Sequence, residues 1–184
     1  MEAIYKDTKD KMEKAVISLK QEFSRLRTGR ATPALLDGVR VEYYGSLTPL
    51  NQVANVSVPD PKMIVIQPWD QNALTAIEKA IIKTDLGLNP QTDGKIIRVP
   101  IPSLTDERRK DLVKLVKKQG EDSKVSIRNI RRQANESIKG REKDKAISED
   151  DSKKAQDNIQ KQTDEYIAQI DKIMQTKEKE ILEG

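Results

Sequence analysis

The stretch LTDERRKDLVKLVKKQGEDSKVSIRNIRRQANESIK, residues 104–139, carries two periodic patterns at once. One pattern predicts the buried face of a long helix, because apolar side chains and one glutamine recur at three- and four-residue spacing: Leu112, Leu115, Val116, Gln119, Ile127, Ile130, Ala134 and Ile138. The other pattern places basic side chains on roughly the opposite side: Lys110, Lys114, Lys117, Lys124, Arg128, Arg131 and Lys139. A helix of about 35 residues is on the order of 50 Å long. We therefore expect one face to pack on other helices and the other to offer a line of cations.

Two further stretches have the spacing of amphipathic helices. In residues 2–28 the apolar stripe comprises Tyr5, Met12, Val16, Leu19, Phe23 and Leu26. In residues 148–183 it comprises Ala155, Ile159, Gln162, Tyr166, Ile170, Ile173 and Ile181. Ser148 is followed by three acidic residues, a pattern typical of a helix start, because the hydroxyl caps the first turn and the acids suit the helix dipole. None of the three helices can bury its stripe alone, so together they predict an antiparallel bundle.

Residues 30–103 differ in composition, with more glycine and proline and less charge. Alternating or continuous apolar side chains in four short segments predict strands: 39–44, 53–58, 64–66 and 96–99. Asn72 is expected to cap a helix that carries the apolar residues Leu74, Ile77, Ala80, Ile81 and Ile82. Trp69 is expected to pack in or beside the core, with stacking on a base as the alternative. The short connections favour a small, mostly antiparallel α/β unit.

The predicted fold class is α+β, with an antiparallel three-helix bundle formed by residues 1–29 and 105–184 and a small α/β domain, residues 30–104, inserted into it. The chain crosses between the two parts twice. Both crossings are short and lie near glycine or proline, which predicts a hinge: Gly29, Arg30, Ser103, Leu104 and Thr105. Gly29 follows the last periodic residue of the first helix, where a left-handed backbone is expected.

The composition excludes several kinds of active site. The chain of 184 residues has no cysteine and no histidine, so thiolate chemistry and the commonest general base and metal ligand are absent. Gly94-Lys95 resembles a fragment of a phosphate-binding loop, but it lacks the upstream glycine and the following Ser or Thr, and it predicts a turn. We expect no enzymatic activity, no cofactor and no bound metal. No apolar run approaches the ~18–20 residues of a membrane span, so we expect a cytoplasmic protein without a membrane partner.

Positive charge concentrates on the long central helix. Residues 107–145 contain 14 Lys and Arg against 7 Asp and Glu, whereas residues 146–184 contain 6 against 10. Such clustering is typical of a nucleic-acid-binding surface. The alternative is a solvated helix face, in which case the chain is a helical coiled-coil adaptor whose small domain binds another protein.

Arginines within one turn of this helix are the strongest candidates for binding. Arg128, Arg131 and Arg132 lie close together, and Lys124 lies one turn earlier. The planar guanidinium group binds phosphate with two parallel hydrogen bonds. Because aromatic residues make up only 3% of the chain, few side chains are available to stack on bases. The pattern favours recognition of folded RNA by its shape and backbone.

Several multi-residue motifs occur in one order along the chain: Arg27-Thr28-Gly29-Arg30-Ala31, Val41-Glu42-Tyr43-Tyr44-Gly45, Leu86-Gly87-Leu88-Asn89-Pro90, Ile97-Arg98-Val99-Pro100, Leu104-Thr105 with Glu107-Arg108-Arg109-Lys110, Arg128-Asn129-Ile130-Arg131-Arg132 with Ala134-Asn135, and Ile147-Ser148-Glu149-Asp150-Asp151. In these motifs, and over essentially its full length, the chain resembles the bacterial ribosome recycling factor family.

The resemblance implies an L-shaped molecule in which a three-helix bundle and a smaller α/β domain are joined by two linkers. It implies action after termination, when the family, with elongation factor G and GTP, splits the ribosome into subunits. The bundle is implied to bind large-subunit ribosomal RNA through its basic side, and the small domain to swing and meet elongation factor G. The resemblance carries over Arg109, Arg128 and Arg131 on the long helix and Arg30 at the hinge. Lys124 and Arg132 come from the charge pattern alone. We expect a monomer.

Overall fold

The computed structural model describes all residues, 1–184, and divides them into two compact units. The first unit comprises Met1–Phe23 and Lys110–Leu182, and the second comprises Ser24–Arg109 and Glu183–Gly184. None of the helices is both long enough and apolar enough to cross a membrane. No group of three or more acidic, histidine or cysteine side chains is arranged to hold a metal ion.

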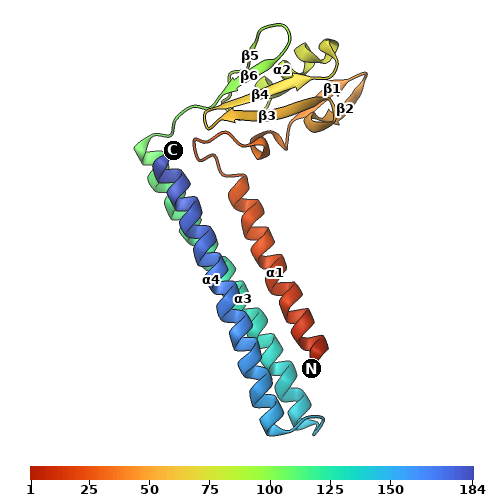
Figure 1. Ribbon diagram of the computed structural model, residues 1–184, viewed down its shortest axis with the longest axis vertical. Coiled ribbons are helices and arrows are strands. Elements are labelled where there is room, and N and C mark those ends of the chain that lie inside the picture. The colour runs from red at the N-terminus through yellow and green to blue at the C-terminus, as the bar shows by residue number, and fades with distance from the viewer. The chain divides into compact units, whose positions relative to one another are not determined.

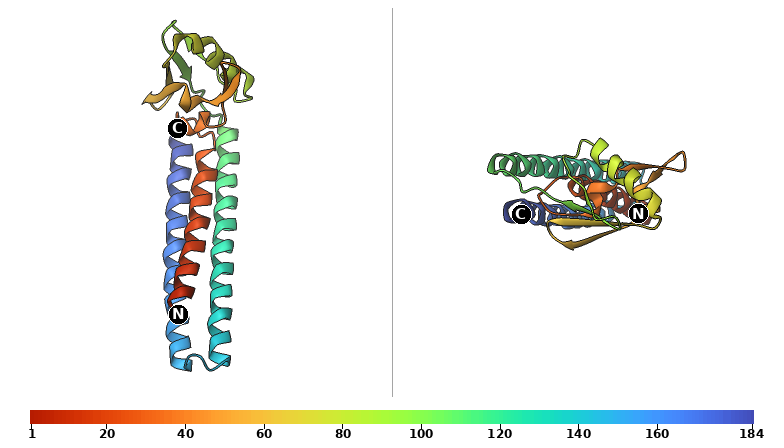
Figure 2. Two further views of the ribbon diagram at one scale, coloured as in Figure 1. Left: turned by 90° about the vertical axis from the view of Figure 1, so that its right-hand side faces the viewer. Right: turned by 90° about the horizontal axis from the view of Figure 1, so that it is seen from above.

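Three long helices form the first unit: α1 (Glu2–Ser24), α3 (Asp106–Lys143) and α4 (Glu149–Glu183). They run alongside one another, with α3 antiparallel to the other two (Figures 1 and 2). The predicted bundle and the α+β fold class are confirmed. The buried side chains recur every three or four residues along each helix, as the apolar stripes predicted: Met12, Val16, Leu19 and Phe23 in α1; Leu112, Val116, Ile127 and Ile138 in α3; Ala155, Ile159, Ile170 and Ile181 in α4.

The buried stripe of α3 differs from the predicted one in its first turns. Leu115 is 38% exposed, whereas Val116 and Gly120 are buried. Gly120 is needed for close packing against α4, because a Cβ at this position would overlap Met174 Sδ and lie 2.6 Å from Met174 Cε and Cγ. In these turns the buried positions of α3 are therefore four residues apart, at Leu112, Val116 and Gly120, and Leu115 lies at the edge of the core.

The Ser148 hydroxyl caps the start of α4, as the sequence predicted, and Asp151 completes a capping box there. The Ser148 hydroxyl oxygen accepts a hydrogen bond from the Asp151 backbone N–H at 3.1 Å, and Asp151 Oδ2 accepts from the Ser148 backbone N–H at 3.4 Å and from its hydroxyl at 2.7 Å. These hydrogen bonds from Ser148 hold the pKa of Asp151 below its ordinary value. The reciprocal bonds satisfy backbone donors that a helix otherwise leaves unpaired.

The second unit contains six strands and one α-helix around one core. The strands are β1 (Arg40–Tyr43), β2 (Ser46–Pro49), β3 (Ala54–Asp60), β4 (Met63–Pro68), β5 (Gln91–Thr92) and β6 (Ile97–Pro100), and the helix is α2 (Leu74–Lys83). β1 and β2 form a hairpin, and the other strands form a sheet in the order β3-β4-β6-β5 (Figure 1). Every strand pair is antiparallel, which confirms the predicted pairing. Short 3₁₀ turns occur at Pro33–Leu36, Leu50–Gln52 and Gln71–Ala73.

Two predictions for the second unit are wrong. Trp69 is 68% exposed rather than packed in the core. The buried residues of β4 are Ile64, Ile66 and Pro68, and because side chains alternate along a strand, the next residue points to the other face. Asn72 does not cap α2, because the residue before that helix is Ala73 and forms no side-chain capping bond. Asp70 instead caps the 3₁₀ turn Gln71–Ala73 that leads into α2, since Asp70 Oδ1 accepts a hydrogen bond from the Asn72 backbone N–H at 2.9 Å. This bond is the main reason why the pKa of Asp70 lies below its ordinary value.

Candidate nucleic-acid interface

Seven cations lie on the exposed side of α3 and are here called the outer row: Lys110, Lys114, Lys117, Lys118, Arg128, Arg132 and Lys139. None of them forms an ion pair or a side-chain hydrogen bond with another residue. They recur at helical spacing on the face away from the buried stripe of α3. A rigid helix therefore presents a row of free positive charges to solvent, which suits phosphate groups at fixed spacing.

Lys124 does not belong to the outer row. Its side chain is only 12% exposed, and its Nζ pairs with Asp171 of α4 and, at 3.1 Å, with Glu121 Oε1. The hydrogen bond to Asp171 is the main cause that raises the pKa of Lys124 above its ordinary value. The ammonium group is already neutralised within the bundle, so Lys124 serves the packing of α3 against α4.

Arg131 is less exposed than the outer row but, unlike Lys124, forms no ion pair. It is half-buried, and its NH1 donates a hydrogen bond to Gln160 Oε1 of α4 at 3.2 Å. No carboxylate pairs with it, so its charge is not neutralised. It lies on the same flank of α3 as Lys124, seven residues earlier, and neighbours Arg128 of the outer row, three residues earlier on the helix.

Acidic residues of α4 explain why some cations of α3 are paired within the bundle while others with similar spacing remain free to bind a ligand. They recur every seven residues: Asp150, Asp157, Asp164 and Asp171. This heptad pattern is typical of positions flanking a helix–helix seam. Asp171 pairs with Lys124, and Asp164 accepts a hydrogen bond at 2.8 Å from Gln160, the partner of Arg131. The pattern was present in the sequence and could have separated the paired from the free cations.

Arg30 and Arg109 belong to the second unit rather than to the bundle. Arg109 is 28% exposed; its NH1 lies 3.6 Å from Asp106 Oδ1, and its Nε is buried without a hydrogen-bond partner. Arg30 is half-buried and lines a pocket of about 210 Å³. Neither side chain belongs to the outer row.

The two predicted crossings of the chain lie beside each other within the second unit. Gly29 has a φ of +76°, as expected for a left-handed position, and a Cβ there would lie 3.3 Å from Leu104 Cγ. Lys62 Nζ donates a hydrogen bond to the Gly29 carbonyl oxygen at 2.6 Å. Helix α1 ends at Ser24 rather than at residue 28, so Gly29 is not its cap. The reason is that Thr28 and Gly29 are buried with the second unit rather than with the bundle.

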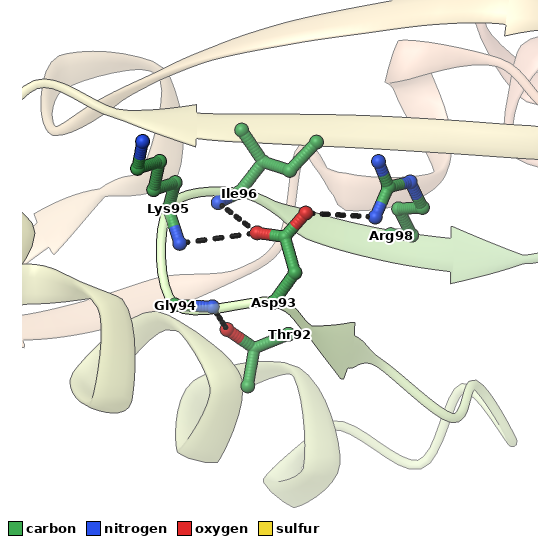
Figure 3. Close-up of polar contacts among 6 residues, drawn as sticks. All are labelled: Thr92, Asp93, Gly94, Lys95, Ile96 and Arg98. Atoms are coloured by element: carbon green, nitrogen blue, oxygen red, sulfur yellow. Dashed lines mark hydrogen bonds and ion pairs between the residues drawn. The ribbon is translucent and has the colours of Figure 1, made fainter.

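The turn at Gly94-Lys95 is confirmed as a turn, and its backbone donors are occupied (Figure 3). Asp93 Oδ1 accepts hydrogen bonds from the backbone N–H groups of Lys95 and Ile96 at 3.1 and 3.0 Å, which hold the pKa of Asp93 below its ordinary value. Asp93 Oδ2 pairs with Arg98 NH1 at 2.9 Å. A carboxylate therefore fills the place that a phosphate would need.

Comparisons with known proteins agree with one another. A family model for ribosome recycling factor matches residues 19–182. The ribosome-recycling factor of Nitratidesulfovibrio vulgaris is 57% identical over 183 residues, covering 100% of this chain and 98% of that protein. The ribosome-recycling factor of Solidesulfovibrio magneticus is 58% identical over 183 residues, covering 100% of both.

Solved structures give the same result. A solution structure of the ribosome recycling factor has a TM-score of 0.78 and 49% sequence identity, covering 100% of this chain and 97% of that chain. A structure described as models for the T. thermophilus ribosome recycling factor and the E. coli elongation factor G bound to the E. coli post-termination complex has a TM-score of 0.69 and 51% identity, covering 98% of each chain.

Proposed function

Because the chain belongs to the ribosome recycling factor family, we propose that it acts with elongation factor G and GTP to split post-termination ribosomes into subunits. The similar T. thermophilus factor, described together with elongation factor G on a post-termination complex, supports this partner and this stage of translation. The free energy for splitting would come from GTP hydrolysis by elongation factor G, so this chain would need no catalytic residue of its own. A role in translation fits a cytoplasmic location.

The bundle docks on ribosomal RNA of the large subunit through the outer row. The single observation that carries this proposal is that seven cations on one exposed helix face lack any partner within the protein. Binding to phosphates releases counterions, which favours association without any ordering of a loop. Arg131 adds to the outer row beside Arg128, because its hydrogen bond to Gln160 leaves its charge uncompensated. Lys124 is left out because Asp171 already neutralises it.

Residues 30–104 form the part that moves and faces elongation factor G, while residues 1–29 and 105–184 form the RNA-binding part. The left-handed backbone of Gly29 and its proximity to Leu104 support a hinge at these crossings. Because the two crossing segments lie side by side, they would bend at the same point when the small domain moves. Arg30, Ser103 and Thr105 complete the candidate hinge. Arg30 and Arg109 would then act near the crossings rather than with the outer row.

Co-sedimentation with large ribosomal subunits tests the docking step. We expect the chain to pellet with the subunits at low salt and to be released as salt rises, because each neutralised phosphate contributes to the salt dependence. A chain that stays in the supernatant at every salt concentration would instead fit a helical coiled-coil adaptor with a solvated basic face. Sedimentation equilibrium of the free chain tests the expected monomer.

A further inference from the structure

The turn of the β1–β2 hairpin holds a tyrosine in a backbone conformation that tyrosine disfavours. Tyr43 and Ser46 pair at the ends of the two strands, so Tyr44 and Gly45 form a two-residue turn. Both have a positive φ, +48° for Tyr44 and +77° for Gly45. Such turns favour Asn-Gly or Gly-Gly, because a larger side chain at a positive φ crowds the neighbouring carbonyl oxygen. Residues held in such conformations concentrate at functional sites.

The ring of Tyr44 is held in place but not buried. It is 80% exposed. Its hydroxyl donates a hydrogen bond to Asp70 Oδ2 at 3.2 Å. The ring also packs edge-to-face against the Tyr43 ring, with the two centroids 4.5 Å apart. These two contacts fix the orientation of the Tyr44 ring and leave most of its surface open to solvent.

Tyr43 already attaches the hairpin to the rest of the second unit. Its ring packs against the core, and its hydroxyl donates to the same oxygen, Asp70 Oδ2, at 3.1 Å. Asp70 lies between β4 and the turn Gln71–Ala73, so this bond connects β1 to the end of β4. The hydroxyl of Tyr44 repeats a contact that the fold already has. Its exposed ring is therefore available for a contact outside the fold.

The side-chain oxygens beside the ring can accept hydrogen bonds but have no hydrogen left to donate. Tyr43 and Tyr44 both donate their hydroxyl hydrogen to Asp70, so each phenol oxygen keeps its lone pairs. The Asp70 carboxylate accepts a further bond from the Asn72 backbone N–H, but no cation pairs with it. The three residues Tyr43, Tyr44 and Asp70 are here called the tyrosine site. It combines an open aromatic ring with acceptors and one uncompensated negative charge.

The charge around the tyrosine site is negative. In the hairpin, residues 41–49, and after β4, residues 69–73, the charged residues are Glu42 and Asp70, with no lysine or arginine. Glu42 is exposed and forms no ion pair. A nucleic acid would bring phosphates toward these carboxylates, which disfavours stacking of a base on Tyr44. A cation is attracted both by the carboxylates and by the face of the ring.

We propose that the tyrosine site binds an arginine side chain of a partner protein, with the guanidinium group over the Tyr44 ring and its N–H groups donating to Asp70 and the phenol oxygens. A guanidinium group is planar, stacks on aromatic rings and has five N–H donors, so it matches a ring beside several acceptors. A lysine ammonium matches less well, because it is compact and strongly hydrated. The proposal goes beyond the recycling function, because it concerns neither the outer row nor the crossings.

The experiment is an NMR titration of the full-length, ¹⁵N-labelled chain with the blocked tripeptide acetyl-Gly-Arg-Gly-amide. We expect saturable shifts of the Tyr44, Gly45 and Asp70 amides, with a Kd on the order of 1–10 mM, because a single side chain makes the contact. The same peptide with citrulline in place of arginine has nearly the same shape but no charge. At matched ionic strength it should cause no saturable shift.

Two variants test the ring and the charge separately. Tyr44→Asn should keep the hairpin, because asparagine adopts a positive φ readily, and should raise the Kd at least about fivefold. Asp70→Asn keeps an acceptor for the Asn72 N–H but removes the charge, and should raise the Kd about 5- to 10-fold. Asp37→Asn is the matched control, because it removes an exposed, unpaired carboxylate before the other end of β1 and should leave the Kd unchanged.

Several results would overturn the proposal. These are equal binding of the citrulline peptide, an unchanged Kd in Tyr44→Asn or Asp70→Asn, shifts only away from the tyrosine site, or no saturable shift at all. An oligouridine of about six nucleotides that shifts the Tyr44 amide saturably would assign the ring to a base instead.

Discussion

Replacing Arg128 and Arg132 together by glutamine should separate the free cations of α3 from the paired ones. Both side chains are exposed, and neither has a partner within the bundle. Glutamine removes the charge while keeping helix propensity similar, so the fold should not change. Lys124→Met is the matched variant, because it removes one cation that Asp171 already neutralises.

The expected magnitudes follow from the exposure of these groups. If about 4–6 phosphates are neutralised, binding should fall with log salt at a slope near −3 to −5, and the double variant should reduce this slope by about 1.4–1.8. Each arginine is fully hydrated in the free protein, so its contact with a phosphate replaces water and contributes only modestly to binding. We therefore expect the loss of one arginine to raise the Kd about tenfold, and the loss of both to raise it about a hundredfold. The assay is binding of the fluorescently labelled chain to large ribosomal subunits across a salt series.

Lys124→Met should behave in the opposite way. The slope of its binding against log salt should equal that of the unchanged chain. The free energy of unfolding should fall by about 1 kcal/mol, and no more, because Asp171 is 47% exposed and water replaces its lost partner. This loss corresponds to a decrease of roughly 2–4 °C in Tm. An unchanged slope in the double variant, or a slope in Lys124→Met reduced as much as in the double variant, would refute the assignment of the outer row.

Three further predictions concern stability and motion. Gly120→Ala should destabilise the bundle by about 1 kcal/mol in urea unfolding, because the strain against Met174 exceeds the gain in helix propensity, and the same substitution should cost less in a chain that already carries Met174→Ala; a more stable single variant would contradict this packing. Asp151→Asn should lower Tm at neutral pH, and this difference should shrink as pH falls from about 4 through the lower folded pKa of Asp151, because a carboxylate with a lowered pKa stabilises the fold above its unfolded pKa and loses this effect as pH falls through the folded value; a difference in Tm that does not shrink with acid would show that the charge of Asp151 does not contribute to the cap. Gly29→Val should impair subunit splitting more than binding to the large subunit, since its φ of +76° disfavours a β-branched side chain, whereas Gly38→Ala, with no atom within 4 Å of the added Cβ, should affect neither; equal losses of splitting and binding in Gly29→Val would argue against a hinge.

Much of the fold could be predicted because it depends on residues that lie close together in the sequence. Apolar side chains at three- and four-residue spacing decide where α1, α3 and α4 bury their faces, since a helix has only one face to bury in a bundle. Ser148 and the three acidic residues after it predicted the start of α4, because a helix cap depends only on residues within the first turn. The turn at Gly94 was predictable for the same reason.

The features that sequence reasoning missed depend on contacts between distant segments. Lys124 and Arg128 have equivalent charges, and only the position of Asp171 on α4 decides that one is paired and the other free. Trp69 looked like a core residue by its size, but strand alternation after Pro68 puts it on the surface. The small residue at position 120 has a role only because Met174 occupies the space beside it.

Light scattering of post-termination ribosomes tests the central claim most directly. The ribosomes would be mixed with this chain, elongation factor G and GTP, and each component would be omitted in turn. We predict a decrease in scattering that requires all three components and that the double variant at Arg128 and Arg132 slows at physiological salt. No decrease, with an active elongation factor G and with the chain bound to the ribosome, would contradict the recycling function.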